Sequence, residues 1–194
     1  MIEVLTTFHK AGWDQYGKRM VKTFLEYWPE DIKIHLYCEN VGTGLNHPRV
    51  VEHDIFKTCP FLTEFLAINN NEYNNGIRDR KRDFKYDAIK FCYKVFAQCH
   101  RIKNSKADTL IFIDADTVTF AKPPMDKIQK LLPKDNFTAY IGRPNNNKLP
   151  FAETGYIMYD LKHGHTKDFA DVFEDLYTSG KIFGLEYQVD CFTY

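Results

Sequence analysis

The 194-residue sequence lacks an excess of charge and has no long hydrophobic run. It contains 26 Lys and Arg against 26 Asp and Glu, so the formal net charge is zero. Proteins that bind nucleic acid or anionic membranes through a general basic surface usually carry excess positive charge, and we therefore expect neither partner. The most apolar run, Leu110 to Ile113, is far shorter than the roughly 18 residues that a membrane helix needs. We expect no membrane span.

The sequence also lacks the marks of a secreted protein. Its N-terminus has neither the basic start nor the apolar stretch of roughly 7–15 residues that a signal peptide requires. The five cysteines are an odd number, widely spaced and without a Cys-x-x-Cys pair, which favours neither a disulfide framework nor a zinc site. We therefore expect a cytoplasmic protein.

Apolar periodicity predicts strands that alternate with helices, as in α/β layered folds. The continuous apolar run 109–113 is typical of a strand buried on both faces in a mostly parallel sheet. Residues 59–85 show a weaker pattern and predict a surface excursion, whose charged run 78–85 is either a solvated face or a loop that contacts phosphate. The expected strands are 2–8, 32–38, 50–55, 109–113, 137–142 and 154–161, and the expected helices are 14–28, 61–68, 86–102, 125–132 and 166–178.

Two aspartates, Asp114 and Asp116, follow the strand predicted at 109–113. Side chains alternate along a strand, so both carboxylates are expected on one side, at the carboxyl end where ligands bind in open α/β sheets. Carboxylates held this close repel one another unless a cation compensates them. Their hard oxygen atoms favour Mg²⁺ or Mn²⁺ over zinc. The sequence therefore predicts a metal site that binds a diphosphate, while two aspartates of a β-turn, which give the same pattern by accident, stay open as an alternative.

Five segments, taken in order along the chain, resemble the GT-A nucleotide-sugar glycosyltransferases. The segment LIFIDADTVTF resembles the DXD strand of that family, and DAIKFCYKVFA resembles the helix before it. The other three are looser matches. The five segments are Thr6-Thr7-Phe8 after the first strand, DAIKFCYKVFA (87–97), LIFIDADTVTF (110–120), FAETGYIMYDL (151–161) and EYQVDCFTY (186–194).

The resemblance implies a three-layer α/β sandwich with a mostly parallel sheet. It implies a metal-dependent, hexosyltransferase-like enzyme that moves a sugar from a nucleoside-diphosphate-sugar donor to a hydroxyl acceptor on a glycan, lipid or protein. For two of the residues that it implies, Lys90 and Lys94, solvated positions on the helix stay open as an alternative. For Phe8 a core position stays open. The implied roles are Asp116 as main ligand of Mn²⁺ or Mg²⁺, Asp114 on the ribose or the metal, Lys90 and Lys94 on the donor phosphate or sugar, and Thr6, Thr7, Phe8 and Tyr16 around the nucleoside.

An inverting transfer needs a carboxylate to deprotonate the acceptor hydroxyl, and Asp190 and Glu153 are the candidates. Structural roles, as a helix N-terminal acid and as a turn residue, stay open for them. Many proteins of this fold take a third metal ligand from a histidine near the C-terminus, but here no histidine follows His165. We expect one catalytic domain over residues 1–194. Either water and substrate complete the coordination of the metal, or a C-terminal extension is lacking.

Three other functions are weighed against this one. The segment Asp114 to Val118 also satisfies the signature of haloacid-dehalogenase phosphatases, but the acidic pair that this family needs further on is missing. A nucleotidyltransferase usually begins with a glycine-rich phosphate loop, which Lys10-Ala11-Gly12 scarcely provides. A non-catalytic module that binds a nucleotide sugar remains open.

Overall fold

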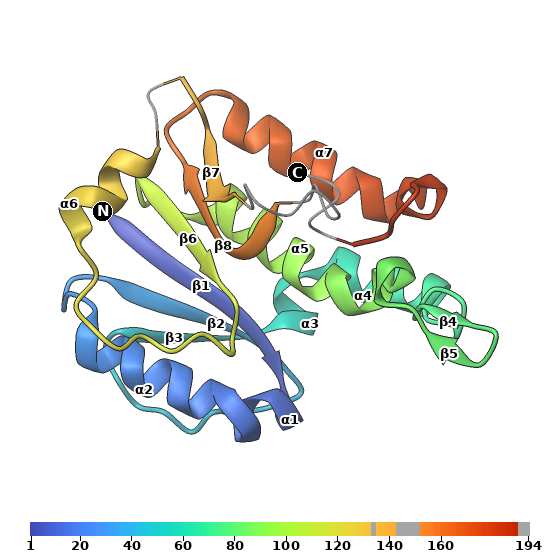
Figure 1. Ribbon diagram of the computed structural model, residues 1–194, viewed down its shortest axis with the longest axis horizontal. Coiled ribbons are helices and arrows are strands. Elements are labelled where there is room, and N and C mark those ends of the chain that lie inside the picture. The colour runs from blue at the N-terminus through green and yellow to red at the C-terminus, as the bar shows by residue number, and fades with distance from the viewer. Residues whose placement is uncertain (133–134, 143–151, 190–194) are drawn as a thin grey trace.

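The computed structural model describes residues 1–132, 135–142 and 152–189 (Figure 1). Its centre is a six-stranded sheet in the order β3-β2-β1-β6-β8-β7, and two short strands form a separate hairpin. The strands of the sheet are β1 (Ile2–His9), β2 (Lys33–Glu39), β3 (Val50–Asp54), β6 (Thr109–Ile113), β7 (Thr138–Ile141) and β8 (Glu153–Asp160). The hairpin consists of β4 (Ile77–Arg78) and β5 (Lys81–Arg82).

Four neighbouring strands of the sheet run parallel. Strand β1 pairs in parallel with β2 and β6, and β2 pairs in parallel with β3. Strand β8 pairs antiparallel with both β6 and β7. The carboxyl ends of the four parallel strands therefore meet at one edge, where open α/β sheets bind ligands. The expected mostly parallel α/β sheet is confirmed.

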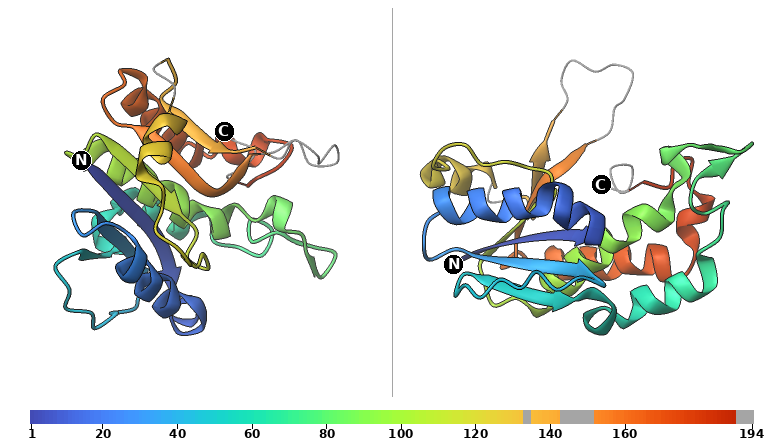
Figure 2. Two further views of the ribbon diagram at one scale, coloured as in Figure 1. Left: turned by 60° about the vertical axis from the view of Figure 1, so that its left-hand side comes forward. Right: turned by 90° about the horizontal axis from the view of Figure 1, so that it is seen from below.

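Helices cover both faces of the sheet and complete three layers (Figures 1 and 2). On one face lie α1 (Lys10–Gly12), η1 (Trp13–Gly17), α2 (Lys18–Tyr27), α6 (Met125–Ile128) and the 3₁₀ turn η3 (Gln129–Leu131). On the other lie α3 (Ile55–Thr58), α4 (Pro60–Asn69), α5 (Ala88–Asn104), α7 (His165–Thr178) and the 3₁₀ turn η4 (Lys181–Gly184). The 3₁₀ turn η2 (Phe84–Tyr86) precedes α5.

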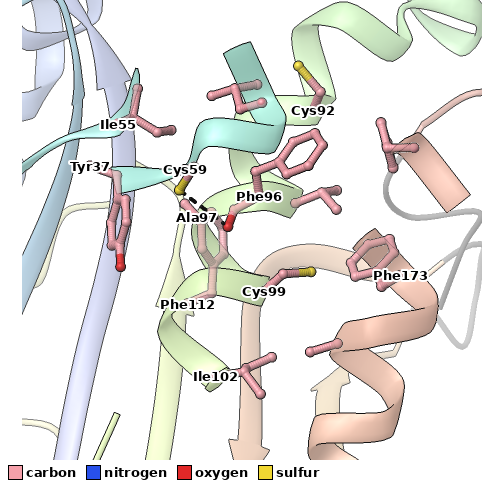
Figure 3. Packing of buried hydrophobic residues seen from close by; sticks show 14 of the residues in the cluster. Tyr37, Ile55, Cys59, Cys92, Phe96, Ala97, Cys99, Ile102, Phe112 and Phe173 are labelled. Carbon is pink, nitrogen blue, oxygen red and sulfur yellow. Dashed lines mark hydrogen bonds between the residues drawn. The ribbon is translucent and has the colours of Figure 1, made fainter. Parts of the chain in front are cut away.

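Helix α5 is the centre of one hydrophobic core (Figure 3). Its apolar residues pack between Phe112 of β6 and Phe173 of α7. Asp87 caps the helix, because its Oδ1 accepts a hydrogen bond from the Lys90 amide at 3.0 Å. Burial of a side chain such as Phe96 contributes about 1.5–3 kcal/mol relative to leaving it exposed. This core holds α5 against the strand that precedes Asp114.

The helix predicted at 14–28 begins earlier and contains a wider turn. Helical residues run from Lys10 to Tyr27, and Trp13–Gly17 form a π-helical segment. Two glycines let aromatic rings lie directly against the backbone there. A Cβ at Gly12 would lie 2.5 Å from the Tyr16 hydroxyl oxygen, and a Cβ at Gly17 would lie 2.8 Å from the Trp13 ring. The wide turn follows β1 directly and brings Tyr16 to the carboxyl edge of the sheet.

Other segments differ from expectation in smaller ways. The helix expected at 125–132 is a single turn of α6 followed by a 3₁₀ turn. The surface excursion carries the unpredicted hairpin β4–β5, which stands away from the sheet (Figure 2). Helix α3 was not predicted, and it begins at Ile55, the last residue of the strand expected at 50–55. The other predicted strands and helices agree with the observed ranges to within about two residues.

The cysteines at 38, 59, 92 and 99 are buried and free, whereas Cys191 lies outside the described residues. Cys59 donates a weak hydrogen bond from Sγ to the Phe96 carbonyl at 3.7 Å (Figure 3). Among the described residues, we find no helix with both the length and the apolar character needed to cross a membrane.

Candidate active site

A cavity of about 390 Å³ opens at the carboxyl edge of the sheet, and we call it the aspartate cavity. Strands β1 and β8, the turn after β6, the segment η1 and helix α5 all contribute to its wall. Most residues that the sequence predicted for the site meet here. Those that line the cavity are Thr7, Tyr16, Lys90, Lys94, Asp114, Asp116 and Glu153.

The two aspartates belong to a turn after β6 rather than to the strand itself. The strand ends at Ile113, and the Thr117 amide donates to the Asp114 carbonyl at 3.0 Å. The Asp114 amide donates to the Gly155 carbonyl of β8 at 2.9 Å. Strand alternation is therefore not what places both side chains at the cavity. The turn does so, and it leaves Asp116 exposed while the Asp114 side chain is 43% exposed.

Lys94 is buried, although the amphipathic pattern of α5 predicted it on the polar face. Its Nζ donates to the Thr154 carbonyl at 2.5 Å and lies 3.2 Å from Asp114 Oδ1. The same ammonium lies 4.5 Å from the centre of the Phe112 ring, within the range of a cation–π contact. These contacts join α5, β6 and β8 at one point. Lys94 therefore orients the Asp114 carboxylate and offsets its charge.

Gly155 provides the space that the Asp114 carboxylate occupies. A Cβ at this position would lie 3.0 Å from Asp114 Oδ2 and 3.4 Å from Glu153 Oε1. The Gly155 amide donates to Glu153 Oε1 at 3.3 Å. The first residues of β8 thus hold two carboxylates beside one glycine. Glu153 lies at the wall of the cavity. Its role as a base for the acceptor hydroxyl stays a prediction.

Tyr16 closes another side of the cavity in a negative environment. Burial, together with the charges of Asp116, Glu39 and Asp114, raises the pKa of the Tyr16 hydroxyl. Glu39 is the last residue of β2, and the sequence analysis did not select it. Burial raises the pKa of its carboxyl to about 7. Position at the carboxyl end of a parallel strand, which singled out Asp114, was the signal that could have found Glu39.

Among the described residues, two that the sequence predicted for the site do not line the cavity. Thr6 is fully buried, and Phe8 is 2% exposed and stacks on Trp13 with ring centres 5.0 Å apart. Phe8 therefore takes the core position that the sequence left open as an alternative. Asp190 lies outside the described residues. Lys90, by contrast, lines the cavity and is exposed.

The carboxylates of the cavity fit a hard divalent cation bound partly by substrate. Among the described residues, no group of three His, Cys, Asp or Glu side chains converges on one point. Mg²⁺ in proteins is often held by only one or two carboxylates, with waters and substrate phosphates completing its six ligands. Asp114 and Asp116 supply that number of carboxylates beside open space. Phe91, Ala115 and Thr154 complete the wall, and sequence reasoning did not single them out.

Comparison with known proteins adds evidence on the fold. No protein-family model and no curated protein matches the sequence. Solved structures do match: mouse xyloside xylosyltransferase 1 aligns with a TM-score of 0.60 and 10% identity over 100% of this chain and 80% of its own. The chain has a GT-A glycosyltransferase fold.

Two other glycosyltransferase structures show the same likeness over part of their length. GlyE of Streptococcus pneumoniae aligns with a TM-score of 0.56 and 13% identity, over 100% of this chain and 42% of its own. The bifunctional glycosyltransferase WbbM aligns with a TM-score of 0.56 and 13% identity, over 96% of this chain and 35% of its own. The chain thus spans less than half the length of either protein.

Proposed function

We propose that this protein is a metal-dependent glycosyltransferase that moves a sugar from a nucleoside-diphosphate-sugar donor to a hydroxyl acceptor. One observation carries the proposal. In a fold shared with glycosyltransferases, two adjacent aspartates line a cavity at the carboxyl edge of the sheet, together with a buried and an exposed lysine. The phosphatase alternative gains no support from the fold.

In this proposal Asp116 and Asp114 hold Mn²⁺ or Mg²⁺, and Lys94 keeps the Asp114 carboxylate in place. A divalent ion there offsets the negative charge that develops on a departing nucleoside diphosphate. Exposed Lys90 lies at the wall with its charge available to donor phosphate, and Thr7 and Tyr16 line the nucleoside side. Glu153 is the described carboxylate that we propose near the reacting sugar.

We further propose that the described residues form one catalytic domain, because one sheet lies between two cores. The buried free cysteines fit work in a reducing compartment such as the cytoplasm. The acceptor is a hydroxyl of a glycan, lipid or protein.

Asp116→Asn tests the proposal, because it removes one negative charge with little change of shape. Thermal unfolding is measured with and without Mn²⁺ against UDP, GDP, CMP and ADP, followed by turnover of the matching nucleotide sugar. We expect one nucleotide to stabilise the native protein in the presence of Mn²⁺, by about 2.7 kcal/mol at 100 times its Kd. Asp116→Asn should remove this shift and lower kcat about a hundredfold.

Asp126→Asn is the matched control, since Asp126 is exposed on α6 and does not line the aspartate cavity. It should behave as the native protein does. Wild-type activity in Asp116→Asn would contradict the proposal. Nucleotide binding without any turnover would indicate a non-catalytic binding module instead.

A further inference from the structure

A second cavity, of about 610 Å³, lies on the surface excursion between α4 and α5, and we call it the asparagine-rich cavity. The turn after α4 supplies Asn70, Asn71 and Asn75, and the β4–β5 hairpin supplies Arg80 and Arg82. Its volume lies in the range of roughly 300–1,000 Å³ that is usual for small-molecule sites. The proposed donor site does not use it.

Hydrogen bonds fix the amide groups of this cavity and leave others available. Asn75 Nδ2 donates to Asn70 Oδ1 at 2.9 Å and to the Asn71 carbonyl at 2.8 Å. The Asn74 amide donates to Asn71 Oδ1 at 3.0 Å. Within the part of the chain that the structure describes, the Nδ2 groups of Asn70 and Asn71 and the Oδ1 of Asn75 keep their hydrogen-bonding capacity. The cavity therefore presents oriented donors beside an acceptor.

The charges of the lining nearly cancel. Arg82 Nε donates to Asp87 Oδ2 at 2.8 Å, so the buried Asp87 offsets this guanidinium. Glu72 and Arg80 add one charge of each sign. A site for a phosphate or polyanion would need a net positive wall, which this cavity lacks. A site for a lipid would need an apolar wall, but Ile77 is the single apolar residue of the lining. Amide, guanidinium and carboxylate groups together suit the adjacent hydroxyls of a sugar, each of which both donates and accepts.

The hairpin holds Arg80 at the cavity in an unusual backbone conformation. Asp79 and Arg80 have φ angles of 48° and 63°, in the left-handed region. Two-residue hairpin turns of this kind favour Asn-Gly or Asp-Gly, because glycine adopts positive φ without strain. An arginine where glycine is favoured suggests that its side chain has a role.

The asparagine-rich cavity is linked to the aspartate cavity through one carboxylate. Asp87 Oδ2 accepts from Arg82, and Asp87 Oδ1 caps α5 at the Lys90 amide. Arg82 lines the first cavity and Lys90 lines the second. In Figure 1 the hairpin lies beside the first turn of α5. Asp87 therefore connects a residue that lines one cavity with the first turn of the helix that lines the other.

We propose that the asparagine-rich cavity binds the acceptor as a neutral glycan. This inference rests on the proposed transfer, whose acceptor it names. Sugar units away from the reacting hydroxyl bind the turn and the hairpin, and the chain leads along the start of α5 to the aspartate cavity.

Arg80→Gly tests this proposal, because glycine fits the φ of 63° and removes the whole side chain, guanidinium included, without straining the turn. Asp79→Gly is the matched control at φ 48° in the same turn, since Asp79 does not line the cavity. An array of neutral and acidic oligosaccharides first identifies glycans that the native protein binds. Initial rates at saturating donor then give the acceptor KM, and thermal unfolding confirms that both variants fold.

We expect the acceptor KM of Arg80→Gly to rise at least tenfold, a similar rise in Glu72→Gln, and a change below twofold in Asp79→Gly. An unchanged acceptor KM in Arg80→Gly overturns the inference, as does native protein that binds no glycan or only acidic ones. Donor hydrolysis without acceptor reports the donor site separately. If hydrolysis fails while the array shows binding that Arg80→Gly loses, the glycan site stands and the transferase proposal falls.

Discussion

Two glutamates at opposite ends of neighbouring strands have opposite environments. Glu3, near the start of β1, is 7% exposed and accepts hydrogen bonds from Arg101 Nη2 at 2.6 Å and Ser105 Oγ at 2.7 Å. Burial alone would raise the pKa of Glu3, but contacts with His35, Ser105 and Arg101 outweigh burial and hold it at about 2. Glu39, at the end of β2, makes no side-chain hydrogen bond or ion pair among the described residues, and burial raises its pKa to about 7.

This difference distinguishes the amino end of the sheet, where contacts stabilise the fold, from the carboxyl end, where the candidate site lies. At the amino end, Glu3 binds Arg101 and lies near His35, which hydrogen-bonds His53, so side chains from β1, β2, β3 and α5 form one connected network that we call the closed end.

At the carboxyl end, which we call the open end, half-buried Asp114 and Glu153 and exposed Asp116 border the aspartate cavity. Glu39 lies close enough to Tyr16 of the cavity wall for its charge to raise the pKa of Tyr16. Proteins commonly keep unfavourable polar groups where a ligand has to bind, and satisfy them elsewhere.

The largest expected effect comes from breaking the closed end. Glu3→Gln leaves the Arg101 guanidinium, whose side chain is 13% exposed, without a negative partner. Removal of one member of a buried ion pair is strongly destabilising, so we expect the free energy of unfolding to fall by about 3 kcal/mol. Urea unfolding at pH 7 measures it. Glu64→Gln, an exposed change on α4, should stay within about 0.5 kcal/mol of wild type, and equal stability of the two variants would contradict the comparison.

The closed end should also weaken in acid. Burial and the charges of His35, Arg101 and His100 outweigh the opposite effect of Glu3 and lower the pKa of His53 to about 4. Below about pH 6.5 the unfolded chain binds a proton on this histidine, whereas the native state binds it only near pH 4. The free energy of unfolding is therefore highest above about pH 6.5 and falls as the pH drops toward 4. The stability difference between wild type and His53→Gln should change by about 2 kcal/mol between pH 7 and pH 4.5. A constant difference in urea unfolding over this range would count against the network.

The open end should respond in the opposite direction. The pKa of Glu39 is raised above its unfolded value, so its ionised form opposes folding above about pH 7, and this penalty disappears as the pH falls toward 4.5. Glu39→Gln should therefore raise the free energy of unfolding by about 1–2 kcal/mol at pH 8 and leave it unchanged at pH 4.5. Loss of stability at pH 8 would show that Glu39 has a structural partner.

Local pattern predicts the elements of this fold better than their directions. The apolar run of β6 and the heptad-like spacing of α5 are strong signals because both elements are buried along their length. The direction of β8, which runs antiparallel to both of its neighbours, has no local signal, since it depends on how the chain returns to the sheet after the aspartates. The hairpin was missed because its turn residues, Asp79 and Arg80, are not the usual ones.

The candidate site shows the same limit at single residues. Adjacent aspartates after a buried strand are visible in sequence, whereas the burial of Lys94 is not, because an amphipathic pattern assigns every lysine to solvent. Its partners, Asp114 and the Thr154 carbonyl, come from two other strands. Phe8 shows the converse, since an aromatic residue at a strand end suits a stacking contact and a core position equally.

Gly155 has no conservative replacement, for reasons of space rather than torsion. It does not have a positive φ, so the backbone of β8 would accept any amino acid there. The Asp114 carboxylate already occupies the volume of a methyl group at 3.0 Å. Alanine would leave the sheet intact and shift the aspartate by a few tenths of an ångström. The glycine hydrogen atom, in place of a methyl group, therefore lets β8 fix the position of the Asp114 carboxylate as well as support the sheet.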